Sequence, residues 1–192
     1  MNRYIIIIAV ILTATFSLSS YSQSGPPVAP MKLDTWLLNF GVGPGTQFWG
    51  NGSGFGPAIK VAAEKGMWEV GPGVFTLGGE FGFSYFKYKY GLDWNETWVN
   101  MIFAARSAYH YGWDVPGLDT YAGVPLGIGF SFFHDSYNLT AENYGARSHS
   151  PVYPYFGLFL GGSYFFNSSL GVNAEVGYNS TFANVGMVFR IK

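Results

Sequence analysis

The chain has 192 residues, of which 48% are hydrophobic, 20% aromatic and only 11% charged, and its formal net charge is −1. Soluble domains usually carry about a quarter charged residues, so part of this surface is expected to face something other than water. The net charge gives no indication of a nucleic-acid partner, and the absence of cysteine excludes disulfides and thiol chemistry. The length predicts a single folded domain.

The N-terminal region has the organisation of a cleaved signal peptide. Arg3 supplies a positive charge, an apolar run extends from Tyr4 to Leu12, and the small residues Ser20 and Ser22 suit a signal peptidase. The apolar run is shorter than the roughly 20 residues of a membrane-spanning helix, although an uncleaved N-terminal anchor is the alternative. We therefore expect a signal peptide over residues 1–23, a flexible lead over residues 24–32 and one folded domain over residues 33–192.

Beyond residue 32, apolar side chains alternate with small or polar side chains along eight segments. A period of two is the pattern of a β-strand with one apolar and one polar face. Most segments reach the roughly 9–11 residues that a tilted membrane-crossing strand needs, whereas globular strands are nearer 5–6. Pro125 cannot donate to a strand ladder, so a bulge or local bend is expected there. The predicted strands cover about residues 33–43, 56–65, 73–88, 97–111, 119–133, 152–165, 170–178 and 183–191.

The final two segments show the alternation most clearly. Val172 and Val185 lie on their apolar faces, whereas Glu175 and Arg190 lie on their polar faces. Strands that face lipid on one side and a polar lumen on the other are the units of a transmembrane barrel. The predicted fold class is therefore all-β: an eight-stranded antiparallel up-and-down transmembrane β-barrel, preceded by the signal peptide. The last strand should close the barrel by pairing with the first near residues 36–42.

The connections between the predicted strands alternate in length. Three are short, at about residues 66–72, 112–118 and 167–169, and three are longer or more polar, at about residues 44–55, 89–96 and 134–150. Outer-membrane barrels have short periplasmic turns and long outer loops, so the second group is expected outside the cell. Aromatic residues near strand ends, such as Trp36, Tyr85 and Tyr178, suit the two girdles at the membrane interfaces.

Charged side chains gather on the predicted inner faces, and both signs occur in similar number. An isolated buried charge is costly, and an eight-stranded barrel is just wide enough for side chains to fill it. We therefore interpret these residues as a paired structural network that fills the lumen. A narrow path for ions or protons is one alternative, and a catalytic pair such as Glu80 and Arg106 is another. The lumen residues are Lys60, Glu64, Glu80, Arg106, His110, Asp119, Glu175 and Arg190.

No other pattern indicates catalysis, and we expect no metal and no cofactor. His110, His134 and His149 could belong to a metal site or a Ser-His-Asp arrangement, but no spacing supports either. The loop histidines are therefore interpreted as ordinary polar residues. The glycine-rich stretch at residues 43–56 lacks the Lys-Ser/Thr of a phosphate-binding loop and is expected to be a mobile outer loop.

Six short motifs follow one another along the chain: Phe40–Gly43, Leu77–Gly82, Ala105–Tyr111, Leu118–Gly123, Gly161–Phe166 and Gly186–Arg190. In this order they resemble the small outer-membrane β-barrel proteins of Bacteroidota, a porin-family group similar in architecture to the OmpA and OmpX barrels. The resemblance implies an outer-membrane location in a Gram-negative bacterium. It also implies contact with outer-membrane lipid and lipopolysaccharide, and with the barrel-assembly machinery during biogenesis. It implies no activity and identifies no protein complex partner.

Three classes of function remain open. The one that we favour is a structural or accessory barrel, which stabilises the outer membrane or supports a larger complex. The second is a narrow pore for ions or small solutes. Large side chains such as Phe86, Tyr121 and Phe159 leave little room for water, which weighs against a pore. The third class is a barrel-fold enzyme or a soluble lipocalin-like binder.

Overall fold

The computed structural model describes residues 31–45, 56–90, 94–137, 148–149 and 151–191. The expected signal peptide lies outside the described residues, as do most of the expected lead and most of the expected outer loops at 44–55 and 134–150. Within the described ranges, no helix has the length and hydropathy needed to cross a membrane. The regular structure in these ranges is β-strand.

In the part of the chain that the structure describes, ten antiparallel strand segments form one sheet. They are β1 (Trp36–Pro44), β2 (Pro57–Val70), β3 (Gly73–Tyr90), β4 (Trp94–Gly112), β5 (Leu118–Tyr137), β6 (Ser148–His149), β7 (Val152–Phe156), β8 (Leu158–Phe165), β9 (Leu170–Tyr178) and β10 (Ala183–Ile191). The segments β6, β7 and β8 all pair with β5, one after another along its length. They therefore occupy a single strand position, and the sheet has eight positions.

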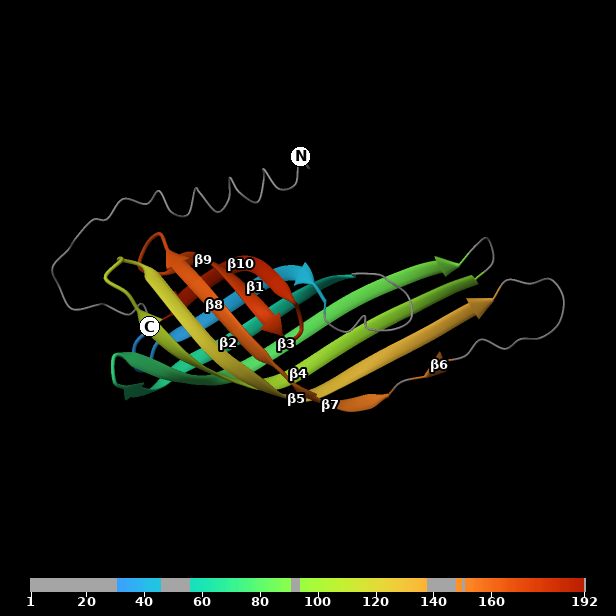
Figure 1. Ribbon diagram of the computed structural model, residues 1–192, viewed down its shortest axis with the longest axis horizontal. Coiled ribbons are helices and arrows are strands. Elements are labelled where there is room, and N and C mark those ends of the chain that lie inside the picture. The colour runs from blue at the N-terminus through green and yellow to red at the C-terminus, as the bar shows by residue number, and fades with distance from the viewer. Residues whose placement is uncertain (1–30, 46–55, 91–93, 138–147, 150, 192) are drawn as a thin grey trace, which may run out of the picture.

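The sheet closes on itself, because β1 pairs with β2 on one side and with β10 on the other. Trp36 lies opposite Ile191, and Val42 lies opposite Val185, so the predicted closing contact is confirmed. The remaining neighbours also pair in antiparallel fashion around the ring. The fold is thus an all-β, eight-stranded antiparallel closed barrel, as the sequence predicts (Figure 1).

Side chains alternate between the outside and the inside of the barrel along each strand. In β10, Val185 is 62% exposed whereas the adjacent Asn184 is 4% exposed. In β9, Val176 points outward and Glu175 is buried in the lumen. Successive residues of a strand point to opposite faces, so the period-two pattern in the sequence is enough to assign the two faces.

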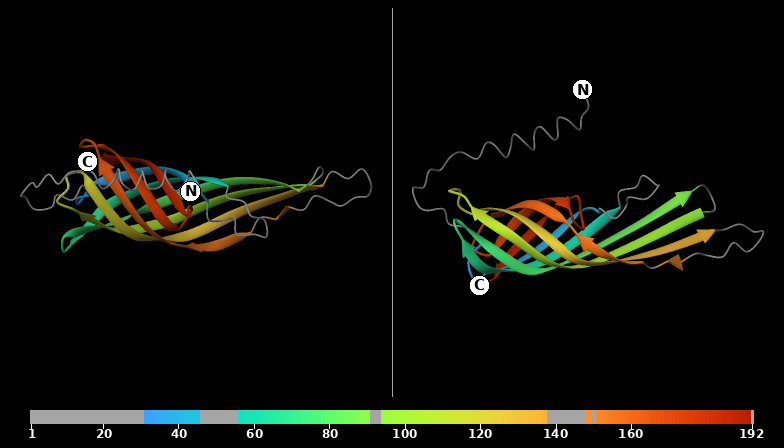
Figure 2. Two further views of the ribbon diagram at one scale, coloured as in Figure 1. Left: turned by 45° about the horizontal axis from the view of Figure 1, so that its top comes forward. Right: turned by 60° about the horizontal axis from the view of Figure 1, so that its bottom comes forward.

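Strands β3, β4 and β5 are much longer than the other strands, with 18, 19 and 20 residues. They continue past the last pair between β2 and β3, Ala58 with Ser84, and project from one rim of the barrel (Figures 1 and 2). The predicted loop at residues 89–96 is therefore wrong in large part, because Lys89 lies opposite Asn95 in a hairpin. The sequence did not predict these strand ends because they carry many polar residues. A strand that lies outside the barrel needs no continuous apolar face, so the alternating pattern is lost there.

Pro125 lies in β5 without a bulge, which is one of the two irregularities expected there. The register of β5 against β4 is continuous on both sides of the proline. On its other side Pro125 faces Gly157, whose N–H donates to the Pro125 carbonyl at 3.1 Å. A Cβ at Gly157 would lie 3.1 Å from Pro125 Cγ, so glycine leaves room for the ring. The partner strand, by contrast, is interrupted opposite the proline, between β7 and β8.

Candidate functional site

Among the described residues, the inner face of the barrel holds seven Asp, Glu, Lys, Arg or His side chains that are no more than 4% exposed. They come from five strands that are separated along the chain, and only closure of the barrel brings them together. The seven are Lys60 and Glu64 on β2, Glu80 on β3, Arg106 and His110 on β4, Asp119 on β5 and Glu175 on β9. They form the ion network described below.

Arg106 lies at the centre of the ion network. Its Nε is 2.7 Å from Glu64 Oε1, its Nη1 is 2.8 Å from Glu80 Oε2, and its Nη2 is 2.8 Å from Glu175 Oε2. The centre of the guanidinium group also lies 3.6 Å from the centroid of the Phe159 ring. A guanidinium presents five N–H donors in a rigid plane, so one Arg can bind three carboxylates in fixed directions.

A second cation and two short polar side chains bind the remaining oxygen atoms of Glu80 and Glu175, on the side of Arg106 away from the short turns. Lys60 forms an ion pair with Glu175. Asn179 Nδ2 donates to the same carboxylate at 2.6 Å, and Ser180 Oγ donates to Glu80 Oε1 at 3.2 Å. The connection between β9 and β10 therefore folds its polar side chains into the lumen.

His110 links two carboxylates on the side of the network nearer the short turns. Its Nδ1 is 2.8 Å from Asp119 Oδ2, and its Nε2 is 3.4 Å from Glu64 Oε2. Thr76 Oγ1 donates to the same Glu64 oxygen at 2.7 Å. The imidazole also stacks on Tyr121, with 4.9 Å between the ring centroids. An imidazole that faces carboxylates with both nitrogens can donate to both only in its doubly protonated form.

The inward-facing charges balance when His110 is doubly protonated. Four carboxylates are then matched in number by four cations, which are Lys60, Arg106, His110 and the last predicted lumen residue, Arg190. Arg190 is only partly buried and lies at the turn end, where its Nε donates to the Ser168 carbonyl at 2.6 Å. Its guanidinium centre is 4.8 Å from the Phe165 ring centroid. Of the predicted lumen charges, Arg190 is thus the one that lies at the turn end of the barrel and away from Arg106.

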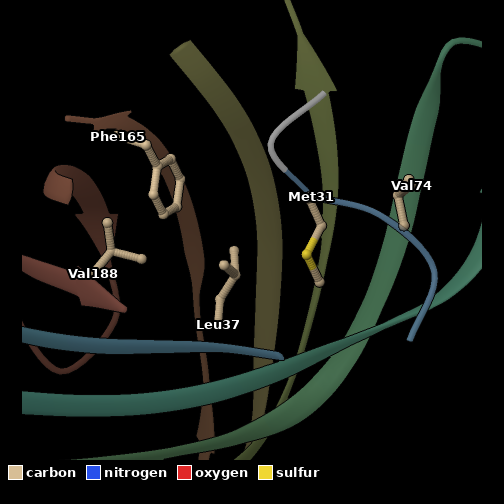
Figure 3. Packing of buried hydrophobic residues seen from close by; sticks show 5 residues of the cluster. All are labelled: Met31, Leu37, Val74, Phe165 and Val188. Carbon is tan, nitrogen blue, oxygen red and sulfur yellow. The ribbon is translucent and has the colours of Figure 1, made fainter. Parts of the chain in front are cut away.

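An apolar cluster fills the lumen at the end with the short turns. Its side chains are directed toward one another from four strands and from the segment before β1 (Figure 3). Met31 is fully buried there, although the sequence places it in a flexible lead. No periodic pattern surrounds this methionine, so sequence reasoning had no signal for it. The cluster consists of Met31, Leu37, Val74, Phe165 and Val188.

A tight turn holds Met31 in the apolar cluster. Asp34 N–H donates to the Gly66 carbonyl at 3.0 Å, and Gly66 N–H donates to the Thr35 carbonyl at 3.0 Å. Asp34 has a φ of 58°, in the left-handed region that short polar residues tolerate. The backbone passes so close to Gly66 that a Cβ there would lie 2.1 Å from the Lys32 carbonyl oxygen. The ordered part of the domain therefore begins before Leu33.

The arrangement favours structure over catalysis or metal binding. Glu80 and Arg106 do meet, but Arg106 is shared among three carboxylates and is fully enclosed. The histidines do not converge, because His110 lies in the lumen and His134 lies exposed on the projecting part of β5. His149 pairs through its backbone with Phe133. Among the described residues, no group of three or more His, Cys, Asp or Glu could hold a metal ion.

Comparisons with known proteins return only structural neighbours. No family model matches the chain. No curated protein matches its sequence either. Among solved structures, it is similar to Ail, the attachment invasion locus protein of Yersinia pestis, with 10% identity and a TM-score of 0.49 over 82% of this chain and 97% of that one. A structure of Ail with the heparin analogue sucrose octasulfate gives 11% identity and the same TM-score and coverage. The fold assignment rests on the strand pairing described above.

Proposed function

We propose that this protein is an integral outer-membrane barrel with a structural or accessory role and a closed lumen. The outer face supports the membrane location, because its exposed side chains are large and apolar around the barrel. Leu126 is 65% exposed, Leu160 62% and Ile59 46%. Such a continuous apolar surface is unfavourable in water but matches the lipid-facing band of a transmembrane barrel.

The single observation that best supports a closed lumen is the complete burial of the Arg106 side chain. Its side chain is 0% exposed, and its three guanidinium nitrogens each bind a carboxylate. Breaking a buried ion pair by removing one partner typically costs about 3–5 kcal/mol. A continuous water path through this layer would have to separate several such pairs at once, so a resting pore is disfavoured.

The accessory role is supported by the division of the chain into a filled barrel and a projecting sheet of β3, β4 and β5. The barrel supplies a rigid anchor in the membrane, and the projecting strands extend from the rim opposite the short turns (Figure 2). Short turns in such barrels are periplasmic, so the sheet would extend outside the cell. Outer-membrane lipid, lipopolysaccharide and the assembly machinery are the partners we propose, and a protein partner would bind the sheet.

Membrane location is tested by cell fractionation and by heat-modifiable migration in detergent gels. We expect the protein in the outer membrane, with a mass that lacks residues 1–23. Leu160→Arg should impair insertion, because a cation on the lipid-facing band costs up to about 2–4 kcal/mol. Leu160→Met is the matched control and should insert normally. Recovery in the aqueous fraction, or equal insertion of both variants, would overturn the membrane assignment.

Closure is tested separately, by conductance across planar bilayers. The purified barrel should give no stable stepwise currents. Reproducible, solute-selective currents from the wild-type protein would instead establish the narrow pore. Affinity purification from detergent-solubilised membranes tests the accessory role, which predicts a reproducible protein partner that is lost when the projecting hairpin is shortened.

A further inference from the structure

Three inward side chains form a row across β5, β8 and β9. Asp119 lies directly opposite Ser163, and Ser163 lies directly opposite Asn173. All three are nearly fully buried, with at most 4% of each residue exposed. The Cβ atoms of such opposed residues are about 4.5–5.5 Å apart, so the three side chains share one small space.

The row lies between the two layers that close the lumen. Phe165, which lies two residues after Ser163 on β8, is a member of the apolar cluster. Gly161, which lies two residues before Ser163, is opposite Glu175 of the ion network. The space beside Ser163 is therefore bounded by apolar side chains on one side and by ion pairs on the other.

Polar atoms in this row lack the hydrogen bonds that burial normally requires. Asp119 Oδ1, Ser163 Oγ and both amide atoms of Asn173 are buried without a hydrogen bond of normal geometry among the described residues. The Tyr121 hydroxyl, which is close to the Asn173 amide, is buried and unsatisfied in the same way and also borders this space. Only the second oxygen of Asp119 is bound, by His110 Nδ1 at 2.8 Å. Buried polar groups in proteins are almost always hydrogen-bonded, either to protein or to ordered water.

We infer that the Asp119–Ser163–Asn173 row is a binding site for ordered water inside the barrel. The row offers a carboxylate that accepts, a hydroxyl that donates and accepts, and an amide that does both through different atoms. A water molecule can both donate to Asp119 and accept from the Asn173 amide nitrogen, and it is small enough for a space between directly opposed side chains. Buried waters typically make about three such hydrogen bonds, which matches the groups in this row.

A metal ion fits the row less well than water does. It would leave the Asn173 N–H donors unbound, and the row contains only one carboxylate. Because closed layers bound the site on both sides, water bound there can exchange with the bulk only when one layer opens. The residence time of this water should therefore be long, and it should report how often the lumen opens.

The test uses the full mature barrel, refolded in detergent micelles. Magnetic relaxation dispersion of water counts internal waters that stay bound longer than the micelle takes to tumble. Wild-type protein should show long-lived water, and the double variant Ser163→Ala, Asn173→Leu should lose at least one such molecule. Ser84→Ala is the matched control: Ser84 is equally buried but accepts a hydrogen bond from Asn100 Nδ2 at 3.4 Å, so its loss should leave the count unchanged. No long-lived water in the wild type, or the same count in the double variant, would overturn the inference.

A stability measurement on the single variant Ser163→Ala keeps the inference testable if the double variant folds poorly. If water binds the hydroxyl, its removal breaks a hydrogen bond, and the urea midpoint should fall. If the site is dry, the same change removes an unsatisfied buried hydroxyl, and the midpoint should stay the same or rise. The second result would refute bound water without bearing on membrane location or conductance.

Discussion

The ion network around Arg106 and the apolar cluster around Met31 lie in the same lumen, yet they exclude water by different means. In the network, directed contacts to three carboxylates hold one guanidinium, and each contact depends on the others. In the cluster, five apolar side chains fill space without directional bonds. Loss of one group should therefore unbalance the network as a whole, whereas the cluster should weaken in proportion to the volume removed.

The comparison also separates two kinds of sequence constraint. A charged layer needs particular residues on particular strands, because a buried charge without its partner is strongly unfavourable. An apolar layer needs only side chains of about the right size, because volume-conserving apolar exchanges are usually tolerated. Four predictions test this difference, in order of decreasing expected effect.

The largest effect is expected from Arg106→Met, which keeps much of the side-chain volume and removes the central cation. Glu64, Glu80 and Glu175 would lose their shared partner, so the free energy of unfolding should fall by at least about 3–5 kcal/mol. Urea unfolding in micelles, followed by tryptophan fluorescence, measures the change. The deficit should shrink at acidic pH, because protonation removes the uncompensated negative charges. Arg190→Met, at a partly exposed position away from Arg106, should cost clearly less, and equal losses would argue against a central role for Arg106.

The next effect is expected from Met31→Ala in the apolar cluster. Truncation of a fully buried methionine should cost about 2–5 kcal/mol, through lost burial and the cavity that remains. Unlike the Arg106 deficit, this loss should not depend on pH. Leu33→Ala provides the control, because Leu33 is 43% exposed and its truncation should change stability by less than about 0.5 kcal/mol. If both variants unfold alike, Met31 does not close the lumen.

A smaller effect is expected from Gly66→Ala, which acts on the apolar cluster indirectly. The added Cβ would lie 2.1 Å from the Lys32 carbonyl oxygen and 3.3 Å from Met31 Cε, so the turn that positions Met31 must shift. We expect a loss of about 1–3 kcal/mol in the same unfolding assay. Gly79→Ala is the control, because a Cβ there meets nothing closer than 3.7 Å. A neutral Gly66→Ala would show that the turn is looser than its close contacts indicate.

The smallest effect is expected from Lys65→Met. Lys65 Nζ lies 2.8 Å from Asp34 Oδ1, but the two side chains are 33% and 86% exposed. Exposed ion pairs contribute about 0–1 kcal/mol, so this variant should unfold almost like the wild type, with little dependence on salt. A loss as large as that of Arg106→Met would mean that burial does not distinguish the two kinds of ion pair.

The sequence by itself determined the class of fold and the two faces of the barrel strands. Alternation of residues such as Asn184 and Val185 is sufficient, because a strand has only two faces and a period of two. It also placed Glu64, Arg106 and Glu175 on inner faces. It could not determine the ends of β3, β4 and β5, because strands that leave the barrel lose the apolar face by which they are recognised.

Only the tertiary structure decided which inward groups meet. Arg106 binds Glu64 and Glu175, from which it is separated by 42 and 69 residues, and Lys60 binds Glu175 across 115 residues. Such contacts depend on the tilt and stagger of the strands, which set the register around a closed barrel and leave no trace in the alternation. The burial of Met31 depends likewise on a single tight turn across Gly66. The period-two alternation in the sequence determines which side chains face the lumen and which face outward, whereas closure of the sheet determines which inward side chains become neighbours.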